Sequence, residues 1–114
     1  MKAIHQKSGI ILGKNIVAAT SFWQRLRGYM FYSTPPVSFD GLYFPRCNLV
    51  HNSFVRFELD VIFIDRKDSI VAVIRRFRPW RFSRLYPKAM HVIEFPAGNV
   101  PDLIHPGDKI IFEN

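Results

Sequence analysis

The chain has 114 residues, of which 48% are hydrophobic and 15% aromatic, and its formal net charge is +7. This length fits one domain over residues 1–114, and the apolar content supplies a core and excludes a disordered chain. The lone cysteine, Cys47, excludes an intrachain disulfide, and no apolar run reaches the roughly 20 residues of a membrane span. We therefore predict a cytoplasmic protein with no signal peptide and no transmembrane segment.

Short strand patterns separated by turn residues run along the whole chain. The segments are residues 10–12, 16–19, 41–44, 59–65, 69–77, 90–95 and 109–112. The first two flank a short polar turn and predict a hairpin. The fourth and fifth are rich in Val and Ile and are joined by three polar residues, which predicts an antiparallel hairpin in the centre of the domain.

Helical patterns are few. Residues 22–27 predict a short helix with Thr20 or Ser21 as the N-cap and Gly28 as its C-terminal stop. Residues 99–104 predict at most one further helical turn. The fold class is therefore mainly β, or β-dominated α+β, as a compact barrel-like or sandwich sheet. Because the two central strands are apolar on both faces, they suit a closed barrel or a sheet covered on both sides.

The strongest functional feature is a basic stretch over residues 75–88 that contains no acidic residue. Its charged residues are Arg75, Arg76, Arg78, Arg81, Arg84 and Lys88, and Trp80 is one of four aromatic residues between them. Guanidinium groups bind phosphate or carboxylate and aromatic rings stack on bases, so the stretch predicts an anionic partner, either acidic protein or nucleic acid. An anionic membrane surface fits the same composition. In the structural alternative, the rings close the core while the arginines cover them or face water.

A second hypothesis concerns catalysis or metal binding. Cys47, His51 and Asp60 could form a metal site or a thiol-dependent enzyme, since thiolate, imidazole and carboxylate are ligand and nucleophile types. Four residues of extended strand separate the first two by about 13 Å, which is too far for one metal ion unless the chain turns. We therefore expect no metal, no cofactor and no convergence of these side chains.

Two carboxylates interrupt apolar strand patterns. Asp60 and Glu94 would be buried, and a buried carboxylate needs a partner or keeps its proton. The natural partners are Arg25, Arg27 and Arg56. We expect a structural ion-pair network among these five residues, with a general acid/base pair as the alternative.

Ordered blocks of residues from about residue 16 to the end resemble the prokaryotic family called domain of unknown function (DUF) 192. The blocks are Arg25-x-Arg27-Gly28-x-Met30, Gly41-Leu42-x-Phe44, Pro45-x-Cys47-x-x-Val50-His51, Arg56-Phe57-x-Leu59-Asp60, Arg78-Pro79-Trp80-Arg81, Glu94-x-Pro96-Ala97-Gly98 and Ile104-x-Pro106-Gly107-Asp108. The resemblance implies a compact β-rich domain and brings no established activity. With no dense catalytic cluster in the sequence, we predict a non-catalytic binding module, and the sequence leaves its oligomeric state open.

Overall fold

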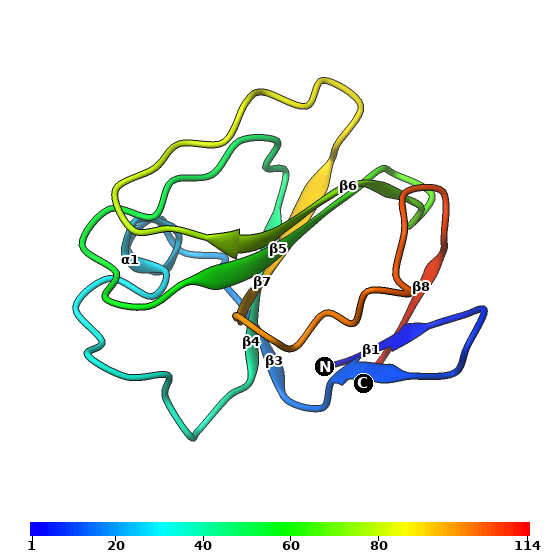
Figure 1. Cartoon of the computed structure of the whole chain (residues 1–114), viewed down its shortest axis with the longest axis horizontal. Helices are drawn as coiled ribbons and strands as arrows, with labels where there is room; N and C mark the ends of the chain where they lie inside the picture. Colours follow the sequence, from blue (N-terminus) through cyan, green and yellow to red (C-terminus); the bar gives the residue numbers. More distant parts are fainter.

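The computed structural model folds into two β-sheets and one short helix (Figure 1). It describes the backbone of residues 1–114 and every side chain except that of Phe22. The elements are β1 Lys2–His5, β2 Ile11–Gly13, β3 Ile16–Ala18, α1 Phe22–Arg27, β4 Gly41–Pro45, β5 Leu59–Ile64, β6 Ile70–Phe77, β7 His91–Pro96 and β8 Ile110–Glu113. The predicted mainly-β class is confirmed, and over the described chain the two sheets do not close into a barrel.

The larger sheet has five strands in the order β3-β4-β7-β5-β6. Its β3–β4 pair is parallel and its other pairs are antiparallel. The predicted central hairpin is confirmed as β5 and β6. Every residue of β5 is buried, because separate hydrophobic clusters pack on the two faces of this sheet. A sheet covered on both faces explains the continuous apolar runs in the sequence.

The smaller sheet has the order β2-β1-β8, and no strand was predicted from the sequence at the position of β1. The hairpin predicted from residues 10–12 and 16–19 is wrong, since β2 pairs with β1 while β3 pairs with β4 in the other sheet. Between them, the amides of Lys14 and Asn15 donate to the Asp40 carboxylate at 2.7 and 3.0 Å. A carboxylate distant in sequence therefore accepts the hydrogen bonds of the turn amides, and the chain passes from one sheet to the other.

Helix α1 begins and ends as predicted. Ser21 is the N-cap, its side chain accepting from the amide of Gln24 while the Gln24 side chain accepts from the amide of Ser21. Gly28 ends the helix at φ 48°, a conformation that suits glycine. None of the described helices is long and apolar enough to cross a membrane. The helical turn predicted at residues 99–104 is absent from the described backbone, which forms turns there.

Two ends of the molecule differ in construction. At one end, the long loops 28–40, 46–58 and 78–90 gather around α1 on the left of Figure 1, and we call this the three-loop end. At the other, β1, β2, β8 and the loop 97–109 pack on the opposite face of the large sheet, and we call this the anchored end. The core clusters divide in the same way, one on each face.

Candidate functional site

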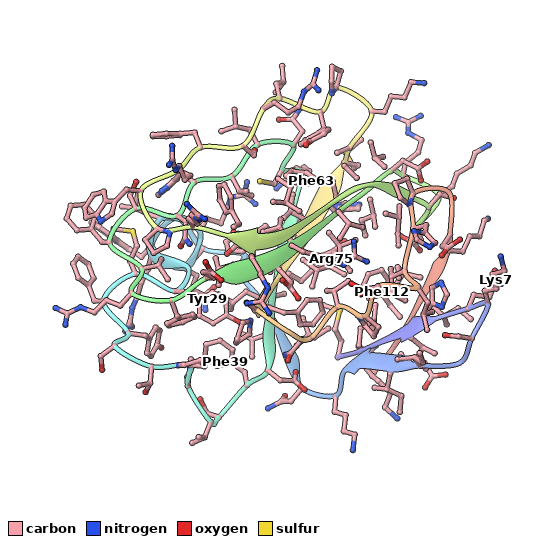
Figure 2. The ribbon with its side chains drawn as sticks, viewed as in Figure 1. Lys7, Tyr29, Phe39, Phe63, Arg75 and Phe112 are labelled. Carbon is pink, nitrogen blue, oxygen red and sulfur yellow. The ribbon has the colours of Figure 1, made fainter. Side chains whose placement is uncertain are left out.

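A small cavity of about 70 Å³ lies at the three-loop end, between α1, β4, β7 and the loop 46–58. Its lining residues are Arg25, Leu26, Arg27, Gly28, Tyr29, Met30, Phe44, Cys47, Leu49, Val50, His51, Val55 and Glu94. Most are apolar, and the wall residue Tyr29 lies beside Phe39 with ring centroids 5.8 Å apart (Figure 2). Several of the blocks that carry the family resemblance therefore converge on one hollow, although they are far apart in sequence.

Glu94 supplies the buried carboxyl group of this cavity. It lies on β7 with only 5% of its surface exposed. Burial raises its pKa from 4.5 to about 8, so at neutral pH the carboxyl group holds its proton. The hydroxyl of Tyr29 reaches the Glu94 backbone carbonyl at 3.4 Å, and burial raises the pKa of that phenol as well.

Cys47 and His51 line the same cavity, but Asp60 does not join them. The Cys47 thiol donates to the carbonyl of Leu49 at 3.2 Å, and burial raises its pKa, which keeps it a thiol. The His51 Nδ1 atom accepts from the amide of Ser53 at 3.3 Å. No three of the described His, Cys, Asp and Glu side chains come close enough to hold a metal ion. The trio of the enzyme hypothesis is therefore not assembled.

Asp60 is buried as expected, but its partners are backbone amides in place of arginines. Its Oδ1 accepts from Arg76 at 3.1 Å, and its Oδ2 accepts from Gly98 and Val100 at 2.9 and 3.0 Å. These bonds hold the loop 97–104 against β5 and β6. Backbone amides are nearer because β5, β6 and that loop converge on the carboxylate.

The expected arginine partners have other contacts. The Arg25 guanidinium donates to the carbonyls of Pro45 and Arg46. Arg27 lies over the ring of Tyr32, 4.5 Å from its centroid. Arg56 is exposed. Among the described side chains, no ion pair joins these three arginines to Asp60 or Glu94.

The charged residues of the basic stretch split into a partly buried one and exposed ones. Arg75 turns inward and donates to the carbonyls of Val100, Pro101 and Ile104, so it lies between the large sheet and the C-terminal loop (Figure 2). Arg76 is exposed and lies 3.6 Å from the Glu58 carboxylate. The exposed cations that follow β6 are Arg78, Arg81, Arg84 and Lys88.

Three exposed aromatic side chains from the three loops meet beside the cavity. Phe31, Phe54 and Trp80 form what we call the aromatic platform, with ring centroids 5.8 Å apart for the first pair and 4.7 Å for the second. They are 71%, 50% and 61% exposed. All three have positive φ, at 70°, 61° and 65°. Such φ values cost about 1–3 kcal/mol each in bulky residues and persist only where the surroundings impose them.

Backbone hydrogen bonds hold the platform in place. The amide of Phe31 donates to the carbonyl of Phe54 at 3.1 Å, and the amide of Trp80 donates to the carbonyl of Asn52 at 2.8 Å. The fully buried Asn52 also donates through its side chain to the carbonyls of Phe57 and Phe77. The loops are therefore tied to one another and to β6.

Sequence reasoning found Trp80 but missed Phe31 and Phe54. Both lie in segments without strand or helix periodicity, so neither has a predicted core position. A large aromatic residue in such a segment is the only signal that could have singled them out, and it does not reveal that the two rings meet.

These features define a small two-sheet β domain with a small open cavity and an exposed aromatic surface at one end. Over residues 4–112 the chain matches the uncharacterized ACR family known as DUF192. The chain belongs to this family, which confirms the resemblance seen in the sequence.

One related sequence and two solved structures are similar to this chain. A UPF0127 protein of Thermococcus sibiricus is 32% identical, with 96% of this chain and 73% of the relative covered. A protein of unknown function from Novosphingobium aromaticivorans has a similar crystal structure, with a TM-score of 0.72, 19% identity, and 98% of this chain and 93% of that chain covered. A Sinorhizobium meliloti protein described as a candidate transcription regulator gives a TM-score of 0.76 at 24% identity, with 96% and 89% covered. At these identities the two structures show a shared fold.

Proposed function

We propose that this protein is a non-catalytic binding domain whose aromatic platform docks an anionic partner, either nucleic acid or acidic protein. The observation that carries the proposal is the platform itself: three exposed rings held together at unfavourable φ values. The positive φ values lower the stability of the fold, whereas a binding surface gains ordered contact area with little entropy left to lose.

The charges around the platform favour an anion. Arg56 lines the same hollow as the three rings, and Arg78 and Arg81 flank Trp80 in the chain. All three are exposed, and none has an ion pair with a described acidic side chain. Guanidinium groups beside exposed rings are the combination that binds phosphates and stacked bases, or carboxylates and apolar side chains.

The test is a binding titration with two labelled probes, a single-stranded DNA oligonucleotide and an acidic peptide containing Leu and Phe. We expect Arg78→Glu/Arg81→Glu to weaken binding strongly while the melting temperature stays unchanged, because both side chains are exposed. For the oligonucleotide, affinity should fall with salt by about 0.7 log units per phosphate contact for each tenfold rise. The probe that binds identifies the class of partner.

The matched control is Lys7→Glu/Lys14→Glu, which makes the same change of net charge through exposed residues outside the platform. Its affinity should fall far less. Equal losses in both double variants would mean that net charge alone governs binding. If neither probe binds at low salt, the proposed function is wrong.

A further inference from the structure

The carboxyl group of Glu94 has no partner among the described side chains, although the residue is almost fully buried. Its strand neighbours across the sheet are Leu42 on β4 and Val61 on β5, which offer no side-chain donor. Glu94 lines the cavity, and a Cβ atom added at Gly28, another lining residue, would lie only 3.8 Å from its Oε1 atom. The carboxyl group is therefore reached through the cavity.

The nearby positive charges are held away from it. The two arginines of α1 that line the cavity bind main-chain carbonyls in one case and a tyrosine ring in the other. Burial alone raises the Glu94 pKa, with no cation lowering it. A buried carboxyl group in this condition lacks the counter-ion that buried carboxylates ordinarily have.

The walls of the cavity suit the rest of a ligand. Tyr29 and Phe44 supply aromatic rings, and Met30, Val50 and Val55 supply apolar contacts. Aromatic faces attract organic cations, and apolar walls cover an alkyl chain. We propose that this cavity binds a primary ammonium group on a short alkyl chain, with the Glu94 carboxylate as its counter-ion. The site lies beside the aromatic platform but is distinct from it, because its lining includes none of the three platform rings and its ligand has the opposite charge.

Two sources carry this chemistry, a free alkylamine and the side chain of a lysine in a partner protein. The volume of about 70 Å³ admits the ammonium group and only a short part of its chain, so either source fits. The experiment therefore has one arm for each source, propylammonium chloride and a blocked Gly-Lys-Gly peptide. The neutral controls of nearly equal size are 1-propanol and the blocked Gly-Gln-Gly peptide.

The readout is the shift of backbone amide resonances in ¹⁵N-labelled full-length protein during titration. We expect propylammonium to move the resonances of Gly28, Cys47 and Glu94, and 1-propanol not to move them. Glu94→Gln keeps the shape of the side chain and should weaken the ammonium roughly tenfold to a hundredfold, because a charge-assisted hydrogen bond is lost. If the lysine peptide moves these resonances and the glutamine peptide does not, the cavity also accepts the lysine side chain of a partner protein.

The pH dependence gives a second measurement that needs no variant. Because the ammonium pairs with the ionised carboxylate, affinity should rise about tenfold per pH unit as pH approaches about 8. The other groups that face the cavity are Arg25, Arg27, Tyr29, Cys47 and His51. His51 is the imidazole among these groups, so His51→Gln is measured beside the wild type and should keep the pH dependence.

Three results would overturn the proposal. The first is equal ammonium affinity in the wild type and Glu94→Gln. The second is binding that weakens as pH rises, or propionate binding in place of propylammonium, either of which would mean that the neutral acid donates to an anion. The third is the absence of any shift with either cation. None of these results bears on the aromatic platform, whose own test uses anionic probes.

Discussion

The two ends of the molecule differ in whether buried polar groups have hydrogen-bond partners and whether aromatic rings are buried. At the anchored end, the 1% exposed His5 has both ring nitrogens bonded, Nε2 to the Asp108 carboxylate at 2.7 Å and Nδ1 to the Ser8 hydroxyl at 2.6 Å. The hydrogen bond from His5 lowers the Asp108 pKa. At the three-loop end, the Glu94 carboxyl group has no described partner, and the rings of the aromatic platform face solvent.

This difference indicates that the three-loop end, and not the anchored end, has groups left free to bind a ligand. Ser8, His5 and Asp108 resemble a catalytic triad by residue type, yet the Ser8 hydroxyl also accepts from the amide of Ile10 within a tight turn. Their bonds join the β1–β2 turn to the turn 105–108 and are complete without a ligand. The unpaired Glu94 carboxyl group and the exposed rings at positive φ both lie at the three-loop end. Energetically unfavourable features of this kind, in an otherwise consistent fold, are typical of functional sites.

The largest effect should come from pH acting on Glu94. Since its folded pKa is raised from 4.5 to about 8, the unfolded chain ionises first as pH rises and folding stability falls over that window. Each pKa unit corresponds to about 1.4 kcal/mol, so the loss between about pH 4.5 and pH 8 should reach several kcal/mol. Urea unfolding at a series of pH values measures it. In Glu94→Gln this fall should be absent; an unchanged fall would place its origin in other groups.

A smaller loss is expected when a completed network of the anchored end is broken. Asp60→Ala leaves the amides of Arg76, Gly98 and Val100 without their acceptor. The bond from Val100 is buried and the other two are partly buried. Donors left unsatisfied away from water are costly, so we expect a loss of about 3 kcal/mol in the free energy of unfolding.

The control for this variant is Asp65→Ala. Asp65 also accepts from two backbone amides, those of Lys67 and Ser69, but in an exposed turn where water can replace it. The loss there should be clearly smaller. Equal losses would show that burial does not determine how much each carboxylate contributes to the free energy of unfolding.

The smallest effect on stability should come from the aromatic platform. Phe54→Gly removes an exposed ring but relieves a φ of 61°, so the stability should change by no more than about 1 kcal/mol. Binding of the anionic probe should fall in the same variant. Phe63→Ala in β5 is the comparison, and loss of that fully buried ring should cost about 3–5 kcal/mol. A loss of stability of similar size in Phe54→Gly would show that the platform ring stabilises the fold as a core residue does.

The local elements and the mainly-β class could be predicted from the amino-acid sequence. Helix α1 follows from the Ser21 cap and the Gly28 stop, and β5 and β6 follow from apolar runs around a polar turn, because these signals act over a few residues. The seven predicted strand segments missed β1, and the predicted hairpin at residues 10–19 failed. A carboxylate at Asp40, distant in sequence, decides how that turn is satisfied.

Which candidate residues share a site depends on contacts between segments that are distant in sequence. The sequence grouped Cys47 and His51 with Asp60 and assigned Glu94 to a different network. The cavity that Cys47, His51 and Glu94 share depends on how α1, β4 and β7 meet. The sequence could not separate the inward Arg75 from the exposed Arg78, since strand register and distant carbonyls set the direction of each side chain. The platform rings and their positive φ values arise because contacts between three loops impose a backbone that no local preference would choose.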